Sequence, residues 1–162
     1  MIDKMTKEEA IIISQWTYDG IYRMYSFIQD EETIQELMNG DYYFCRNEDS
    51  SLLGYFCFQS SARIPTLEED AYALEALDIG LGKEPSQCGQ GKGRDFMMRG
   101  LEFASTLFGA RRFRLSVACF NERAIHLYKQ LGFHVQKEVT HAKSRQKFYI
   151  MLKDEKDFSS II

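Results

Sequence analysis

Apolar and polar residues follow two rhythms along this chain, one typical of strands and one typical of helices. The segments 41–46 and 52–58 are short and rich in aromatic residues, and the polar stretch 47–51 separates them. This arrangement is typical of a β-hairpin. In the segment 94–108 the apolar residues recur every three or four positions instead, which predicts a long helix with one apolar face.

Strand patterns flank that helix on both sides. A strand is expected within 71–81, before the helix, and another over the alternating segment 113–119, after it. The segments 133–139 and 147–152 are expected to close the fold as two more strands. A hairpin followed by strand–helix–strand–helix–strand predicts a mixed α/β sheet.

Two further helices are expected in the first quarter of the chain. Thr6 and Glu9 have the spacing of a capping box, in which each side chain bonds to the backbone of the other residue. They precede the apolar segment 10–16, which is expected to be helical. A second helix is expected over 31–38, and Gly40 is expected to end it, because glycine accepts the left-handed turn beyond a helix.

The composition is that of an ordinary globular protein. Of the 162 residues, 44% are hydrophobic and 27% are charged, and no repeat or linker interrupts them. A single domain spanning residues 1–162 is therefore expected. The formal net charge of −4 argues against general binding of nucleic acid, which needs a basic face.

The chain shows no membrane or secretion signal and no pattern of metal ligands. It lacks any stretch of about 18 apolar residues, and its start lacks the apolar run of a secretory signal. A cytoplasmic protein that does not bind membranes is therefore expected. No metal site is expected either, because no CxxC pair or cysteine–histidine cluster occurs among the four cysteines Cys45, Cys57, Cys88 and Cys119.

A glycine-rich stretch lies between the expected third strand and the long helix. Its residues Gly89, Gly91 and Gly93 alternate with polar side chains. Glycine lets a backbone approach a ligand closely, and the start of a helix presents unpaired amide groups and the positive end of its dipole. Such a combination can hold a phosphate or pyrophosphate.

Several interpretations of this stretch compete. A Walker A loop would need glycine at Ser86 and a serine or threonine at Gly93, so it is excluded. A dinucleotide fingerprint would need a third glycine and a carboxylate ending the next strand, and both are missing. A coenzyme A pyrophosphate loop, a plain flexible turn and a site for another nucleotide phosphate stay open at this point.

Two motifs resemble those of the GNAT superfamily of N-acetyltransferases. The stretch 85–93 is similar to the coenzyme A loop of this family, Arg/Gln-x-x-Gly-x-Gly/Ala, although Cys88 stands at the Arg/Gln position. The stretch 121–133 resembles the family pattern Asn-x-x-Ala-x-x-x-Tyr-x-x-x-Gly-Phe at every specified residue. From the residues alone, Asn121 can also cap a helix that ends before Gly132.

The resemblance implies a fold and a co-substrate. The fold would be a mixed, mostly antiparallel twisted sheet with flanking helices, in which two central parallel strands within 77–81 and 114–119 splay apart. The co-substrate would be acetyl-coenzyme A, and its pantetheine arm would lie in that gap, as an added strand would. The implied cofactor-binding residues are Leu81, Lys83, Cys88, Gly89, Gln90, Gly91, Lys92, Gly93, Arg94, Asn121 and Ala124.

The resemblance also implies direct transfer of an acetyl group from a thioester to a neutral amine. Tyr128 is the candidate that protonates the departing thiolate, with core packing as the alternative role. Glu75 and Asp78 are the candidate general bases, because the family often places a carboxylate near this strand. A solvated or salt-bridged side chain is the alternative for each, and a water chain or a terminal carboxylate could also serve as the base. Two residues three apart on a strand face opposite sides, so at most one would point into the site.

The acceptor amine is not identified by the sequence. The aromatic segment 16–27 could line its pocket or pack in the core, and the acidic run 68–70 could attract a basic amine or simply be solvated. A non-catalytic module that binds or senses coenzyme A is the alternative function. The oligomeric state is left open between a monomer and a homodimer.

Overall fold

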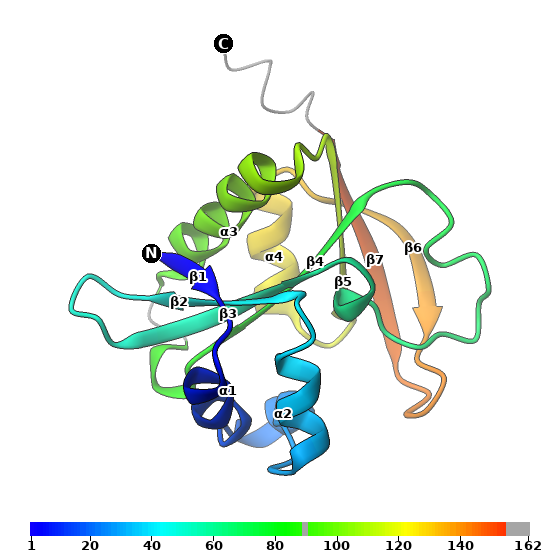
Figure 1. Ribbon diagram of the computed structural model, residues 1–162. Coiled ribbons are helices and arrows are strands. Elements are labelled where there is room, and N and C mark those ends of the chain that lie inside the picture. The colour runs from blue at the N-terminus through cyan, green and yellow to red at the C-terminus, as the bar shows by residue number, and fades with distance from the viewer. Residues whose placement is uncertain (89–90, 155–162) are drawn as a thin grey trace. The chain divides into compact units, whose positions relative to one another are not determined.

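The computed structural model describes residues 1–88 and 91–154, and its helices and strands are labelled in Figure 1. These residues form two compact units. The first unit consists of Met1–Cys57 with the described part of Leu81–Gly91, and the second of Phe58–Gly80 with the described part of Lys92–Ile162. That the two units make one domain stays a prediction.

The first unit contains an antiparallel ladder of three strands, β1 (Ile2–Lys4), β2 (Tyr42–Arg46) and β3 (Leu52–Phe58). The predicted hairpin is therefore confirmed, and its turn passes through Ser50 in the left-handed region, at a φ of 72°. β1 was not predicted, because three residues are too few to show an alternating pattern. It pairs with β2 through Ile2 opposite Cys45.

Two helices of the first unit, α1 (Lys7–Ser14) and α2 (Glu31–Leu37), pack against each other. Both helices were predicted. The capping box at α1 is wrong, because the Thr6 side chain makes no cap hydrogen bond. Glu9 is instead buried and accepts a hydrogen bond of 2.6 Å from Arg46, a partner on β2 that no local pattern announces.

The ends of α2 follow the expected rules. Asp30 caps its start by accepting a hydrogen bond of 2.8 Å from the Thr33 amide. Gly40 follows its end with a φ of 100°, the left-handed conformation for which glycine is suited. A 3-10 helix, Gly20–Tyr25, connects α1 to α2.

An aromatic cluster around Tyr55 forms much of the core of the first unit. The ring of Tyr55 lies 6.3 Å from Trp16, 5.8 Å from Phe27 and 6.0 Å from Tyr42, measured between centroids. Burial raises the pKa of the Tyr55 phenol well above its ordinary value. Of the two roles considered for the aromatic segment 16–27, core packing is the one these rings perform.

The second unit contains β5 (Arg112–Ala118), β6 (His134–Thr140) and β7 (Lys147–Asp154). β7 pairs antiparallel with both β5 and β6. The strand β4 (Leu77–Lys83) begins in this unit and ends in the first, and it starts parallel to β5. The mixed α/β architecture with mostly antiparallel pairing is therefore confirmed, although β4 begins later than the start of the segment 71–81 would suggest.

The helices of the second unit are α3 (Gly93–Phe108) and α4 (Glu122–Gln130), close to their predicted bounds. A 3-10 helix spans Gln59–Ala62. The buried face of α3 consists of Phe96, Met97, Gly100, Leu101 and Ala104. None of the helices in the described part of the chain is long and apolar enough to cross a membrane.

We expect Gly82→Ala to destabilise the protein by about 1–3 kcal/mol, because overpacking a filled site strains it. A Cβ at Gly82 would lie 2.3 Å from Cε1 of Tyr55, and the surrounding rings leave Tyr55 little room to move. Urea denaturation measures the change. In a Tyr55→Ala background the same substitution should cost less than about 0.5 kcal/mol. Equal costs in the two backgrounds would contradict this packing.

Candidate functional site

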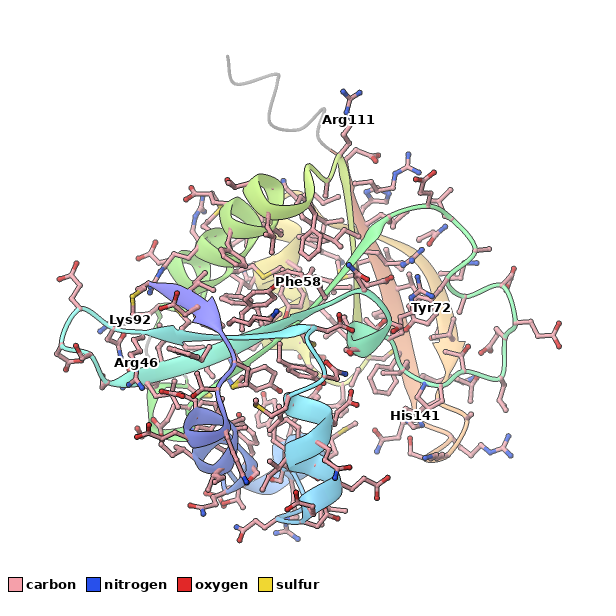
Figure 2. The ribbon with its side chains drawn as sticks, viewed as in Figure 1. Arg46, Phe58, Tyr72, Lys92, Arg111 and His141 are labelled. Atoms are coloured by element: carbon pink, nitrogen blue, oxygen red, sulfur yellow. The ribbon has the colours of Figure 1, made fainter. Side chains whose placement is uncertain are left out.

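The start of α3 presents backbone amides without a capping side chain. The helix begins at Gly93, and its N-cap residue, Lys92, makes no side-chain cap hydrogen bond. The first amides of a helix have no intrahelical acceptor, and the helix dipole is positive there. Lys92, labelled in Figure 2, and Arg94 are both exposed and add positive charge. This helix start can therefore receive an anion.

Two of the predicted loop residues, Gly89 and Gln90, lie outside the described residues. Gly91 is described and has a φ of 73°, which favours glycine. A Cβ added there would meet nothing within 4 Å, so the glycine is required by its backbone conformation and not by crowding.

Gly93 lets the start of α3 approach α4. A Cβ at Gly93 would lie 3.1 Å from Cδ2 of Leu127, tighter than ordinary van der Waals contact. The second unit therefore brings the anion-receiving amides of α3 close to the helix that carries Asn121, Ala124 and Tyr128. In the sequence, these residues were related only because they belong to two motifs of the same family.

Asn121 caps α4, as predicted. Its side-chain oxygen accepts a hydrogen bond of 3.3 Å from the Ala124 amide. This bond satisfies one of the unpaired amides at the start of the helix and explains why the motif has asparagine at this position. The bond stabilises the helix whether or not Asn121 also contacts a cofactor.

The far end of α4 explains the rest of the motif. The Phe133 amide donates to the Tyr128 carbonyl at 3.0 Å, and the Gly132 amide donates to the Lys129 carbonyl at 3.1 Å. With Gly132 at a φ of 98°, this is a Schellman ending, which commonly carries an apolar contact between its flanking residues. Tyr128 and Phe133 make that contact, edge to face at 6.0 Å.

Tyr128 is thus a buried residue with a packing role, and its side chain is 8% exposed. The spacing from tyrosine to Gly-Phe can be explained by the helix ending alone. That explanation fixes the ring and leaves the role of the hydroxyl group open.

The end of β4 belongs to the first unit, together with Cys88. The Lys83 carbonyl accepts a hydrogen bond of 2.6 Å from the Tyr18 hydroxyl, and the Cys88 thiol lies 3.9 Å from the same oxygen. Burial, then the nearby Cys88 and Glu84, raise the pKa of Tyr18 above its ordinary value.

Asp78 has a structural role that disfavours it as a general base. Its carboxylate is buried, and both of its oxygens accept hydrogen bonds from Arg114, at 2.5 and 2.8 Å. Arg63 donates a third at 2.8 Å. Two guanidinium groups donate to the oxygens that a base would use. Asp78 is therefore an ion-pair anchor of the second unit, and its role as a general base stays a prediction.

Glu75 lies before β4 rather than on it and is exposed. Strand alternation therefore does not determine how Glu75 and Asp78 face. The neighbouring Leu74 carbonyl accepts a hydrogen bond of 2.6 Å from Arg114, so the backbone beside Glu75 is fixed by the same ion pair. Among the two predicted carboxylates, Glu75 is the one that stays available to solvent.

Sequence reasoning missed Arg114, Arg63 and Tyr72. Arg114 could have been recognised because it is a charged residue within the alternating strand 113–119. A buried charge there needs a partner of opposite charge. The Tyr72 hydroxyl bonds with Ser116 at 2.6 Å, 44 residues away. Only the fold brings these residues together.

The acidic run 68–70 serves the second unit locally. Glu68 accepts a hydrogen bond of 2.8 Å from the Thr140 amide, and this bond is the main cause that lowers the pKa of Glu68. Asp70 lies 3.6 Å from the ammonium group of Lys137. These contacts give the run a structural use at the end of β6.

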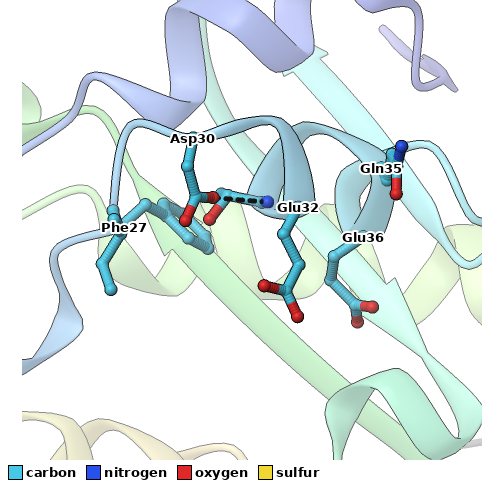
Figure 3. A pocket seen from close by; sticks show the side chains of 7 residues that line it. Phe27, Asp30, Glu32, Gln35 and Glu36 are labelled. Atoms are coloured by element: carbon cyan, nitrogen blue, oxygen red, sulfur yellow. Dashed lines mark hydrogen bonds between the residues drawn. The ribbon is translucent and has the colours of Figure 1, made fainter.

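A groove of about 580 Å³ in the first unit follows the start of α2 (Figure 3). Carboxylates and one aromatic ring dominate its lining, and Glu36 lies 3.4 Å from the Tyr42 hydroxyl. Its acidic character would favour cations over anions. The lining residues are Phe27, Ile28, Asp30, Glu32, Thr33, Gln35 and Glu36.

Comparison with known proteins connects these features. Residues 9–133 match the model of the acetyltransferase (GNAT) family. No curated protein matches the sequence. The matched stretch includes the start of α3 and the whole of α4.

Solved structures share the fold at low identity. One is a chimera of the spermidine N-acetyltransferase SpeG from Vibrio cholerae and hSSAT, with a TM-score of 0.74, 16% identity and 99% of both chains covered. Another is the spermidine/spermine N-acetyltransferase SpeG from Vibrio cholerae in complex with manganese ions. It has a TM-score of 0.71 and 15% identity, covering 99% of this chain and 95% of that one.

We expect Asp78→Asn to lower the free energy of unfolding by about 3–5 kcal/mol, because it leaves Arg114 buried without its counter-charge. Urea denaturation at neutral pH measures this change. Asp70→Asn is the control, since its side chain is 77% exposed and its loss should cost at most about 0.5 kcal/mol. If the two variants were equally stable, Asp78 would not be the anchor described here.

Proposed function

The chain belongs to the acetyltransferase (GNAT) family, and from that premise we propose that it moves an acetyl group from acetyl-coenzyme A to a primary amine by direct attack of the amine. The observation that carries this proposal is the pairing of an uncapped α3 start with α4 inside the matched stretch. A helix start that can receive an anion, packed on a helix that carries a buried phenol, suits a co-substrate in which a pantetheine arm joins a pyrophosphate to a thioester.

The residues present fit coenzyme A. The amides at the start of α3 have no side-chain cap to displace, and Gly93 leaves no bulk between them and α4. We propose that the pyrophosphate binds at these amides and that backbone groups near Leu81 and Lys83 bind the pantetheine arm. The proposed contacts comprise Leu81, Lys83, Cys88, Gly89, Gln90, Gly91, Lys92, Gly93, Arg94, Asn121 and Ala124.

In this mechanism acetyl-coenzyme A supplies the acetyl carbon, which exchanges its bond to sulfur for a bond to the amine nitrogen. The chain must then handle two protons. Glu75 is proposed to take the proton that makes the incoming amine neutral, directly or through water. Tyr128 is proposed to give its hydroxyl proton to the departing sulfur and to regain a proton from the second N–H that the nitrogen loses as the amide forms.

The packing of Tyr128 supports this role. Its backbone and ring are fixed by the ending of α4, so its hydroxyl group is held in one place. A proton donor gains from such pre-organisation, because no ordering is needed at the moment of transfer. Tyrosine is also a weak enough acid to stay protonated at neutral pH until the thiolate forms.

A primary amine is the proposed acceptor class. The similar solved structures are described as spermidine or spermidine/spermine N-acetyltransferases, which makes polyamines the first acceptors to test. A non-catalytic module that binds coenzyme A is the alternative, and turnover separates it from the enzyme.

Acetyl-coenzyme A should raise the melting temperature of the protein, because a ligand that binds only the folded state stabilises it. At a hundred times Kd the gain is about 2.7 kcal/mol. Thermal unfolding with and without the ligand measures it, with ATP and NAD as controls. A shift with ATP or NAD and none with acetyl-coenzyme A would contradict the proposal.

Tyr128→Phe should lower kcat roughly a hundredfold or more while the KM for acetyl-coenzyme A changes little, because general acids contribute about that much to rate. Phenylalanine keeps the aromatic contact with Phe133, so the fold should persist. Thiol release with a saturating amine measures kcat, and Tyr149→Phe is the control. An unchanged kcat in Tyr128→Phe would remove this residue from the mechanism.

A further inference from the structure

Arg63, Arg114 and Asp78 form a cluster with one positive charge in excess. Arg114 is 1% exposed and uses its guanidinium group to bind both oxygens of Asp78 and the Leu74 carbonyl. Arg63 binds the same carboxylate through Nε, at 2.8 Å. Two guanidinium groups thus share a single carboxylate, and the second positive charge has no counter-charge within the cluster.

The uncompensated charge lies on the outer edge of Arg63. Among the described residues, its two terminal nitrogens have no hydrogen-bond acceptor, and its side chain is 41% exposed. Arg114 cannot contribute this charge outward, because its own donors face Asp78 and Leu74 inside the unit. The open edge of Arg63 therefore presents two parallel N–H donors, the geometry that a carboxylate binds with both oxygens.

Tyr72 holds this edge in a fixed orientation. The guanidinium carbon of Arg63 lies 5.2 Å from the centre of the Tyr72 ring, and that of Arg114 lies 5.0 Å from it. The Tyr72 hydroxyl bonds with Ser116 at 2.6 Å and accepts from the Ile64 amide at 3.0 Å. Tyr72, labelled in Figure 2, is therefore fixed at its hydroxyl end and supports Arg63 through its face. A donor held in advance loses little entropy on binding.

The same cluster fixes the backbone beside Glu75. Arg114 holds the Leu74 carbonyl, and Glu75 is the next residue. Under the proposed function Glu75 receives a proton from the acceptor amine. If the amine of the acceptor binds at Glu75, a second polar group of the same acceptor can then bind to the terminal nitrogens of Arg63.

We propose that Arg63 binds a carboxylate of the acceptor, so the preferred substrates are amines that also carry a carboxylate, such as amino acids. This inference rests on the proposed function and narrows its acceptor class. An acceptor made only of amines would meet the excess positive charge of Arg63 without compensation. A carboxylate would neutralise that charge and pair with both free donors.

Matched pairs of amines test this proposal in the unmodified enzyme. Lysine and cadaverine differ only by the carboxylate, as do ornithine and putrescine, and spermidine extends the series of plain amines. The kcat/KM for each should be at least about tenfold higher for the amino acid than for its decarboxylated partner, the discrimination expected of a charged hydrogen bond. Equal values, or a preference for the plain amines, would overturn the inference.

Variants then assign the effect to Arg63. Arg63→Gln should abolish the preference, because the KM of the amino acids should rise at least about tenfold relative to that of cadaverine and putrescine. Arg63→Lys keeps the charge without the planar pair of donors and should restore part of the preference. Arg145→Gln, an exposed arginine in the turn between β6 and β7, is the control and should leave it intact.

Two further outcomes separate this inference from the proposed function. If the enzyme binds acetyl-coenzyme A and acetylates amines while Arg63→Gln retains the full preference, the inference fails and the proposed function stands. If acetyl-coenzyme A neither binds nor turns over with any amine, the proposed function fails and the inference fails with it.

Discussion

A helix leaves its first backbone amides without intrahelical acceptors, and at α3 the side chain of the N-cap residue does not accept from them. Lys92 occupies the cap position without bonding the helix, and Gly93 keeps the first turn free of side-chain bulk. The first amides of α3 can therefore donate to an acceptor from outside the helix. The proposed binding of the co-substrate depends on these amides, because a pyrophosphate bound there would fix one end of coenzyme A on the protein.

The motif on α4 illustrates how one set of residues can satisfy structural and chemical demands together. Asn121 and Gly132 cap the two ends of the helix, and Phe133 packs on Tyr128. These contacts would be needed in a protein without any activity. They also hold the Tyr128 ring in a fixed place, which favours a proton donor for a departing thiolate. Structural and catalytic explanations of the motif are therefore compatible rather than exclusive.

Local sequence patterns predicted those parts of the fold that local interactions determine. The hairpin turn, the cap at Asn121, the left-handed turn at Gly40 and the apolar face of α3 all depend on residues a few positions apart. Distant partners are what local patterns do not show. Glu9 pairs with Arg46 instead of closing a capping box, and Asp78 pairs with Arg114, 36 residues away. A carboxylate near a strand could be recognised from sequence, but whether it was free to act as a base depended on a residue of another strand.

The candidate site, like the fold, could be predicted from the sequence only where local geometry determines it. The glycines and the α4 motif could be found because their spacing reflects local backbone geometry. The Arg63 edge could not, since it exists only where Tyr72 and Asp78 hold one guanidinium group from two sides. Selectivity for an acceptor depends on such long-range arrangements more than on motifs, which is why the family could be identified from a single sequence before any substrate class.

A crystal structure of the protein with coenzyme A would show where the co-substrate binds. We predict pyrophosphate oxygens within hydrogen-bond distance of the first amides of α3, and the thiol sulfur within reach of the Tyr128 hydroxyl. A coenzyme A molecule bound elsewhere, with the start of α3 left facing solvent, would contradict it.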